Sequence, residues 1–155
     1  MDSDGTVWVW SHGAVYRIAD GSIQHLLNPG LSYGHARHEA RGLLASGSYE
    51  GLIIHTDAGE VVFQDSKRGG PWWALDFHPD GRQIVGVNDW GTVECFDLDQ
   101  GTRVWSTKVS DSASRDVQYA PDGSHIIAAC DDGRVIELDG AGNIQFERLT
   151  HCLLY

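Results

Sequence analysis

The sequence predicts an all-β fold built from four similar units, and three observations lead to this prediction. Apolar and polar residues alternate in short runs along the whole chain, and no helical periodicity interrupts them. Tight-turn sequences such as PDG, DWG and DQG separate these runs. The pattern of runs and turns also repeats about every 39 residues, which indicates a repeat architecture.

Composition restricts the kind of protein further. A length of 155 residues suits a single domain, with 41% hydrophobic and 21% charged residues. No apolar run approaches the roughly 18 residues of a membrane-spanning helix, and the start MDSDGTVWVW lacks the pattern of a signal peptide. The net charge of −11 leaves no basic patch for a phosphate backbone. We therefore expect a cytoplasmic protein that binds neither nucleic acid nor membrane.

The repeat is clearest between the third and fourth units. The turns Pro79–Gly81 and Pro121–Gly123 match at an offset of 42 residues. Further shifts of 40 and 38 residues align the second and first units, with Gly51 under Gly91 and Gly13 under Gly51. The units of this single domain are residues 31–69, 70–110 and 111–149, together with a first unit made of residues 1–30 and 150–155.

Each unit is expected to form four short antiparallel strands. In the third unit, alternation such as Trp73, Leu75 and Phe77 marks the strands, and tight turns mark their ends. One such sheet cannot bury both of its faces, so the units must stack on one another. Radial stacking of four-stranded sheets gives a β-propeller with one blade per unit. The strands predicted for the third unit are Trp72–His78, Gln83–Asn88, Thr92–Leu98 and Arg103–Val109.

The third and fourth units resemble the blades of WD-repeat propellers. The resemblance is carried by DFHPDGRQIVGVNDWGTVECFDLDQGTRVW and QYAPDGSHIIAACDDGRVIELD, which share the Pro-Asp-Gly turn, the glycine hairpin and the apolar strand ending in Asp. It is moderate in the second unit and partial in the first. Residues 96–97 and 138–139 are Phe-Asp and Leu-Asp in place of the usual Trp-Asp pair, and residues 34–35 are the nearest approach to the usual Gly-His pair. The resemblance implies a propeller fold and does not fix a function.

The two ends of the chain predict a closure. The first unit starts at its DSDG turn and lacks a first strand, whereas residues 150–155 resemble a strand left over after the fourth unit. An unpaired apolar strand at residues 6–10 would be an aggregation hazard, so we expect the C-terminal strand to cover it. The pairing would close a four-bladed ring within one chain or an eight-bladed ring in a homodimer; alternatively, other sequence completes a longer propeller. We favour the homodimer, because WD-like blades usually come seven or eight to a ring.

Motifs of chemistry are scarce. Nucleotide-binding glycine motifs, a G-x-S-x-G nucleophile and an H-E-x-x-H zinc motif are all absent, so we expect no cofactor. The three cysteines have no metal-finger spacing, and those in apolar strand patterns are expected to be buried thiols. His35 and His38 are the nearest approach to a metal pair, but three residues apart on a strand means opposite faces. We therefore expect them to be polar or turn histidines, and no metal site.

The starts of the first strands give the best candidate binding site. Tyr33, Trp73, Arg115 and His151 occupy equivalent positions, which a closed ring would bring together at one mouth of its central channel. The alternative is that these aromatic residues only pack between blades. Trp90 lies in a turn, where a large exposed side chain often marks a contact surface. The candidate binding residues are Tyr33, Trp72, Trp73, Trp90, Arg115 and His151.

Three functions remain open from the sequence. The first is a non-enzymatic binding or scaffold module that presents a propeller face to a protein or peptide partner. The second is a small-molecule or enzymatic site at the channel mouth, with His151, His35, Asp76 and Asp116 as candidate acid–base groups. The third is a designed or excised propeller fragment without a function of its own. The absence of catalytic motifs favours the first.

Overall fold

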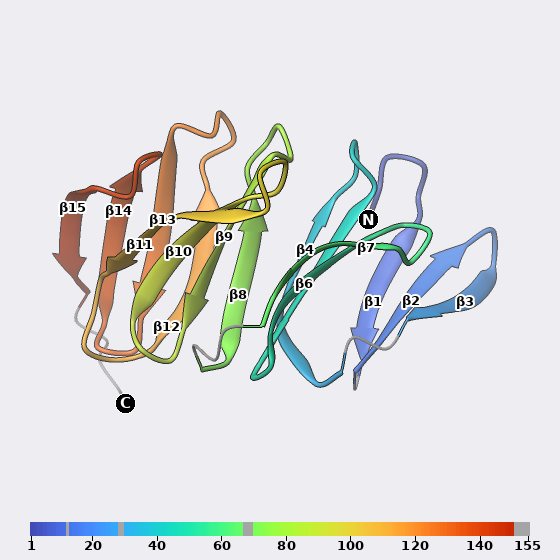
Figure 1. Cartoon of the computed structure of the whole chain (residues 1–155), viewed down its shortest axis with the longest axis horizontal. Coiled ribbons are helices and arrows are strands. Elements are labelled where there is room, and N and C mark those ends of the chain that lie inside the picture. Colours follow the sequence, from blue (N-terminus) through green and yellow to red (C-terminus); the bar gives the residue numbers. More distant parts are fainter. Residues whose placement is uncertain (12, 28–29, 67–69, 151–155) are drawn as a thin grey trace.

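The computed structural model describes residues 1–11, 13–27, 30–66 and 70–150, and every regular element in them is a β-strand. The strands form four antiparallel sheets that lie side by side (Figure 1). No helix of the described ranges is long and apolar enough to cross a membrane. The predicted all-β fold of four stacked units is therefore confirmed.

Each sheet is a simple meander, so strands that follow one another in sequence are neighbours in space. The first sheet holds β1 (Val7–Ser11), β2 (Ala14–Ala19) and β3 (Ser22–Leu27). The second holds β4 (Ser32–His38), β5 (Leu43–Ser48), β6 (Gly51–Thr56) and β7 (Val61–Asp65). The third holds β8 (Trp72–Phe77), β9 (Gln83–Asn88), β10 (Thr92–Asp97) and β11 (Thr102–Lys108). The fourth holds β12 (Ser114–Tyr119), β13 (His125–Cys130), β14 (Arg134–Asp139) and β15 (Ile144–Leu149).

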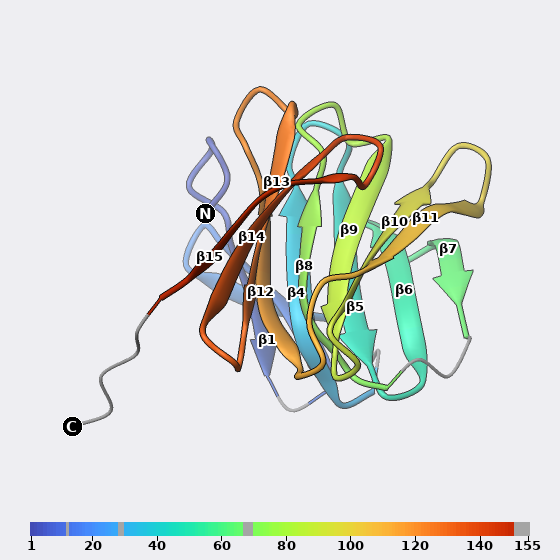
Figure 2. The same cartoon turned by 90° about the vertical axis from the view of Figure 1, so that its left-hand side faces the viewer.

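The first strands of the last three sheets lie together. β8 contacts both β4 and β12, and the sheets spread apart toward their outer strands (Figure 2). This fan of meanders resembles consecutive blades of a propeller, and β4, β8 and β12 form its inner surface.

The core lies between neighbouring sheets, as stacking requires. One buried cluster joins the second and third sheets and includes Leu52, Ile54, Ile84 and Phe96. A second cluster joins the third and fourth sheets, with Val85, Val87 and Val93 of the third fully buried against Ile126, Ala128, Ile136 and Leu138 of the fourth. Both faces of β9 and β10 are therefore largely buried, in agreement with apolar residues on both of their sides, whereas the outer strand β11 is mostly exposed.

The structure corrects the sequence alignment of the second unit. Gly47 and Val87 occupy the same place in their sheets, because they pair with the equivalent residues Gly34 and Ala74. The loop that follows is one residue shorter in the second sheet, where Gly47 pairs with Leu52, than in the third, where Val87 pairs with Val93. The gap-free alignment of Gly51 with Gly91 is therefore wrong, and the offset changes from 40 to 41 within the hairpin.

The first and last sheets share no hydrogen-bonded pairing among the described strands, and they lie at opposite ends of the molecule (Figure 1). β1 is an edge strand, with β2 as its one partner in the described part of the chain. Residues 151–155 of the predicted closing strand lie outside the described residues. Closure of the ring thus stays a prediction.

Candidate functional site

A β-bulge recurs at the start of each inner strand. In β8, Trp72 pairs with Asn88 and Ala74 pairs with Val87, which leaves Trp73 as the extra residue. The same shift leaves Tyr33 extra in β4 and Arg115 extra in β12. A bulged residue is released from the alternation of faces that the rest of the strand obeys. Three of the four equivalent positions that the sequence singles out are therefore bulges, and the fourth, His151, lies outside the described residues.

The bulged side chains contact one another in a row across the three sheets. The rings of Tyr33 and Trp73 lie 5.0 Å apart between centroids. The guanidinium carbon of Arg115 lies 4.3 Å from the centroid of the Trp73 ring, in cation–π geometry. We call this row, Tyr33–Trp73–Arg115, the bulge ladder.

Each rung of the bulge ladder is fixed by a turn residue of its own sheet, 16 positions further along the chain. The Tyr49 ring lies edge-on to Tyr33 at 5.4 Å, and the Trp73 indole nitrogen donates to the Asp89 carboxylate at 2.6 Å. The remaining rung is the ion pair of Arg115 with Asp131, whose closest N–O distance is 2.7 Å. These turn residues are not among the candidates predicted from the sequence, although their constant spacing is visible in it.

A groove of about 440 Å³ runs along the inner surface beside the bulge ladder. β4, β8 and β12 all line it, and Tyr33 and Trp73 belong to its wall. The predicted acid–base candidates His35, Asp76 and Asp116 line it as well. Of the candidate residues predicted at the channel mouth, the structure thus brings together five around the groove and places Arg115 against its wall.

The groove concentrates negative charge in a partly buried place. Burial raises the pKa of the Asp76 carboxyl, and the charge of Asp116 raises it further, against hydrogen bonds that lower it. The chief hydrogen bond comes from the backbone N–H of Tyr119, 2.7 Å from Oδ2 of Asp76. No ion pair joins either carboxylate to a basic side chain of the described residues at 4.0 Å or less. Arg115, which precedes Asp116 in the sequence, is instead paired with Asp131.

The charge of Asp76 should therefore cost stability at neutral pH. We expect Asp76→Asn to raise the free energy of unfolding at pH 7, since the amide oxygen still accepts from Tyr119 and no charge is buried. A raised folded-state pKa gives stability that is lost as pH rises through it, so the advantage of the variant should shrink as pH falls toward 3.8. Urea unfolding of both proteins between pH 4 and pH 7 measures this.

The control for this measurement is Glu60→Gln, which makes the same charge change in the exposed β6–β7 turn. We expect it to leave the unfolding midpoint nearly unchanged. A variant Asp76→Asn that is less stable than the wild type at pH 7 would show that a partner stabilises this carboxylate, contrary to our reading.

Trp72 lies in the core and does not belong to the candidate binding surface. Its side chain is 2% exposed and belongs to the core between the second and third sheets. It packs over Gly47 and Gly86, where no side chain competes for the space. The bulge comes directly after Trp72 in the strand. Trp72 therefore fills the core, whereas the adjacent Trp73 belongs to the bulge ladder.

The two histidines of the weak metal hypothesis have separate structural roles. His35 Nε2 lies 2.8 Å from Ser32 Oγ, its ring contacts the Trp10 ring at a tilt with centroids 5.2 Å apart, and burial lowers its pKa. His38 binds the Pro79 carbonyl through Nε2 at 2.9 Å and accepts from the Arg41 backbone N–H through Nδ1. Within the described ranges no three His, Cys, Asp or Glu residues are placed to share a metal ion.

The remaining predicted site residues lie away from the groove or beyond the description. Trp90 is 57% exposed in the β9–β10 turn, next to Asp89. His151 lies outside the described residues. Cys95 and Cys130 are buried free thiols, and burial raises the pKa of Cys95 to about 11, so it is a poor nucleophile at neutral pH.

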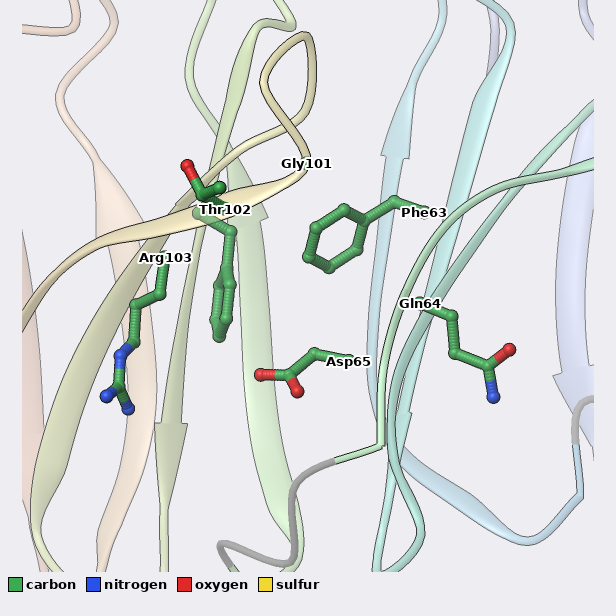
Figure 3. Close-up of a pocket in the computed structure, with 7 residues that line it drawn as sticks. Phe63, Gln64, Asp65, Gly101, Thr102 and Arg103 are labelled. Atoms are coloured by element: carbon green, nitrogen blue, oxygen red, sulfur yellow. The ribbon is translucent and has the colours of Figure 1, made fainter.

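A second hollow, of about 410 Å³, opens on the outer side between β7 and β11. Figure 3 shows Phe63 and Asp65 directed across this gap, whereas Gln64 points away from it. The gap between the third and fourth sheets is instead filled by Trp105, which donates to the Gly140 carbonyl at 3.1 Å. Phe63 occupies the place of Trp105 in the second sheet, so the hollow reflects a smaller side chain at a repeated packing position.

Comparison with known proteins supports the fold and no more. No family model matches the sequence, and no curated protein matches it. Among solved structures, a chain of hydrazine synthase from Kuenenia stuttgartiensis superimposes with a TM-score of 0.84 and 17% sequence identity. The superposition covers 97% of this chain and 48% of that chain, so this chain spans about half the length of that structure. At this identity the likeness shows the arrangement of sheets alone.

Proposed function

We propose that this chain is a non-enzymatic binding module that holds a segment of a protein or peptide partner in the inner groove. The observation that carries the proposal is the bulge ladder along the groove, with Tyr33 and Trp73 in its wall. Aromatic side chains fixed by neighbours lose little freedom on binding, so they are effective anchors.

The charges of the groove favour a basic partner. Asp76 and Asp116 line it together, and the chain carries a net charge of −11. A guanidinium or ammonium group from a partner would neutralise these carboxylates and would also contact the aromatic wall. An arginine side chain suits both contacts, because its flat cation stacks on a ring and bonds to a carboxylate at once.

The proposal includes the closed form of the molecule. We propose that the four sheets are blades of a WD-like propeller, whose ring is completed beyond the described strands. Three features support this: the meander topology, the clustered inner strands and the uncovered faces of the first and last sheets. A closed ring would surround the groove with further inner strands and turn it into one side of a channel mouth.

A peptide titration tests the binding function. The probes are the fluorescently labelled peptide Gly-Gly-Arg-Gly-Gly and its analogue with glutamine in place of arginine. We expect the arginine peptide to bind more tightly, and Trp73→Ala to weaken its binding by about 10-fold, since it removes a large part of the aromatic wall of the groove. Val104→Ala, an exposed strand position outside the groove, should leave the affinity unchanged.

Other outcomes of the titration would change the conclusion. Equal binding of the two peptides would overturn the preference for a basic partner. No effect of Trp73→Ala would place the binding surface elsewhere, and Trp90→Ala then tests the exposed turn. Tight binding of putrescine, a free diamine, with no binding of either peptide would instead favour a small-molecule site in the same groove.

A further inference from the structure

The end face of the fourth sheet is built like an internal interface. Strand pairing places Ile127 and Ala129 of β13, Val135 of β14 and Phe146 of β15 on the face that is turned away from the third sheet, with Glu137 between Ile127 and Phe146. Ile127 is 39% and Phe146 is 53% exposed. A row of apolar residues on an open sheet face indicates that a partner covers it.

The repeat shows what kind of partner fits this face. The corresponding row in the third sheet is Val85, Val87, Val93 and Trp105, because Val87 and Ala129 pair with equivalent residues of the inner strands. The three valines are fully buried in the core cluster between the third and fourth sheets, and Trp105 packs against that cluster. The open face of the fourth sheet is thus apolar at the four positions where the third sheet contacts its neighbour, and Glu137 stands in the place of the buried Cys95.

The opposite end of the molecule supplies the matching surface. Trp8 and Trp10 contact Arg37 and His35 of the second sheet, so the alternate residues of β1 and their partners in β2 face away from it. These outward residues are Val7, Val9, Tyr16 and Ile18. In the fourth sheet the same positions are Ile126, Ala128, Ile136 and Leu138, which are all fully buried against the third sheet.

We propose that the open face of the fourth sheet docks on the open face of the first sheet of a second copy, and that the reciprocal contact closes a ring of two copies. The occupant is a second copy because the two end faces complement each other as the third and fourth sheets do. One copy cannot bring its own first and fourth sheets into contact in this structure, since these sheets lie at opposite ends of the molecule (Figure 1). This inference rests on the ring closure proposed above.

The second copy would also complete the binding site. Asp116 and Gln118 line a small hollow of about 80 Å³ on the open face, together with Ile127 and Ala129. Asp116 belongs to the inner groove as well. A docked first sheet would therefore border the groove on the side of β12, and the ring would contain two copies of the bulge ladder.

Light scattering after size-exclusion chromatography, over a range of concentrations, tests the proposal. We expect the wild type to have twice the mass of the chain. Ile127→Asp and Val9→Asp each place a charge in the joint, so each should weaken dimerisation by roughly 100-fold and leave single copies. Both positions are part-exposed in the single chain, and circular dichroism should show that the fold is retained.

Mixing the two variants tests whether the two copies are joined head to tail. A head-to-tail ring of one Ile127→Asp chain and one Val9→Asp chain contains one joint with both changes and one unchanged joint, so part of the dimer should return. Val104→Asp, an equal change on an exposed strand position away from both end faces, should dimerise like the wild type.

Several results would overturn the inference. A wild type that stays a single copy at every concentration contradicts it, and so does a dimer that Ile127→Asp breaks while Val9→Asp leaves it intact, because that contact joins like faces. A concentration-dependent series of larger species means that the contact does not close. If the single-copy wild type still binds the arginine peptide through Trp73, the two-copy ring fails while the proposed function stands.

Discussion

Replacing Trp72 with alanine should lower the free energy of unfolding by about 3–5 kcal/mol. The indole is 2% exposed and lies edge-on to Phe96, with ring centroids 5.8 Å apart. Gly47 and Gly86 leave the space that it fills, and neither has a side chain that could move into the cavity. The loss would be a large share of the 5–15 kcal/mol that usually stabilises a domain.

Urea unfolding followed by far-ultraviolet circular dichroism measures this effect. Trp90→Ala is the matched control, because Trp90 is 57% exposed and its removal opens no cavity. We expect the control to change stability by less than about 1 kcal/mol. If the two variants were equally stable, the assignment of Trp72 to the core and of Trp73 to the groove wall would be wrong.

Gly91→Ala should destabilise the protein by about 2–4 kcal/mol. Gly91 has a φ of 64°, a conformation that costs about 1 kcal/mol for a residue with a Cβ. An added Cβ would also overlap the backbone carbonyl oxygens of Ser110 and Ser112, which cannot turn aside as a flexible side chain would. The carbonyl of Gly91 accepts the backbone N–H of Val109 at 2.8 Å, so the strain falls on the β9–β10 turn and on the chain leading to the fourth sheet.

Gly5→Ala separates the two causes of this loss. Gly5 has a φ of 85°, but nothing lies within 4 Å of its missing Cβ. We expect it to lose only the conformational cost, about 1 kcal/mol. The difference between the two variants in thermal or urea unfolding then measures the steric part. Equal losses would show that the carbonyl groups near Gly91 move aside at little cost.

The strands were predictable because local chemistry determines them. Alternation and tight turns place three strands of the third unit within one residue of β8, β9 and β10, since a sheet with two buried faces tolerates few exceptions. The outer strand is shifted by one residue at both ends, where exposed residues constrain the boundary less.

Side-chain partners at the site were less predictable. The repeat identifies Tyr33, Trp73 and Arg115 as equivalent, but strict alternation does not reveal a bulge. Without the bulge, Trp72 and Trp73 are indistinguishable as anchors. The contacts of Asp89 and Asp131 depend on how each turn folds back over its own inner strand, which the spacing alone does not state.

The recurring bulge separates the residues that face the groove from the residues that pack the core, although both belong to the same strand. Tyr33, Trp73 and Arg115 are the extra residues of their strand pairs, so they have no partner directly opposite in the neighbouring strand, and their contacts are with turn residues and with one another. Their neighbours in the strand keep the core in register whatever stands at the bulge. Tyr33 and Trp73 line the groove and lie outside both buried core clusters. Substitutions at the bulge, one residue in each of these sheets, would therefore change the chemistry beside the groove and leave the strand pairing unchanged.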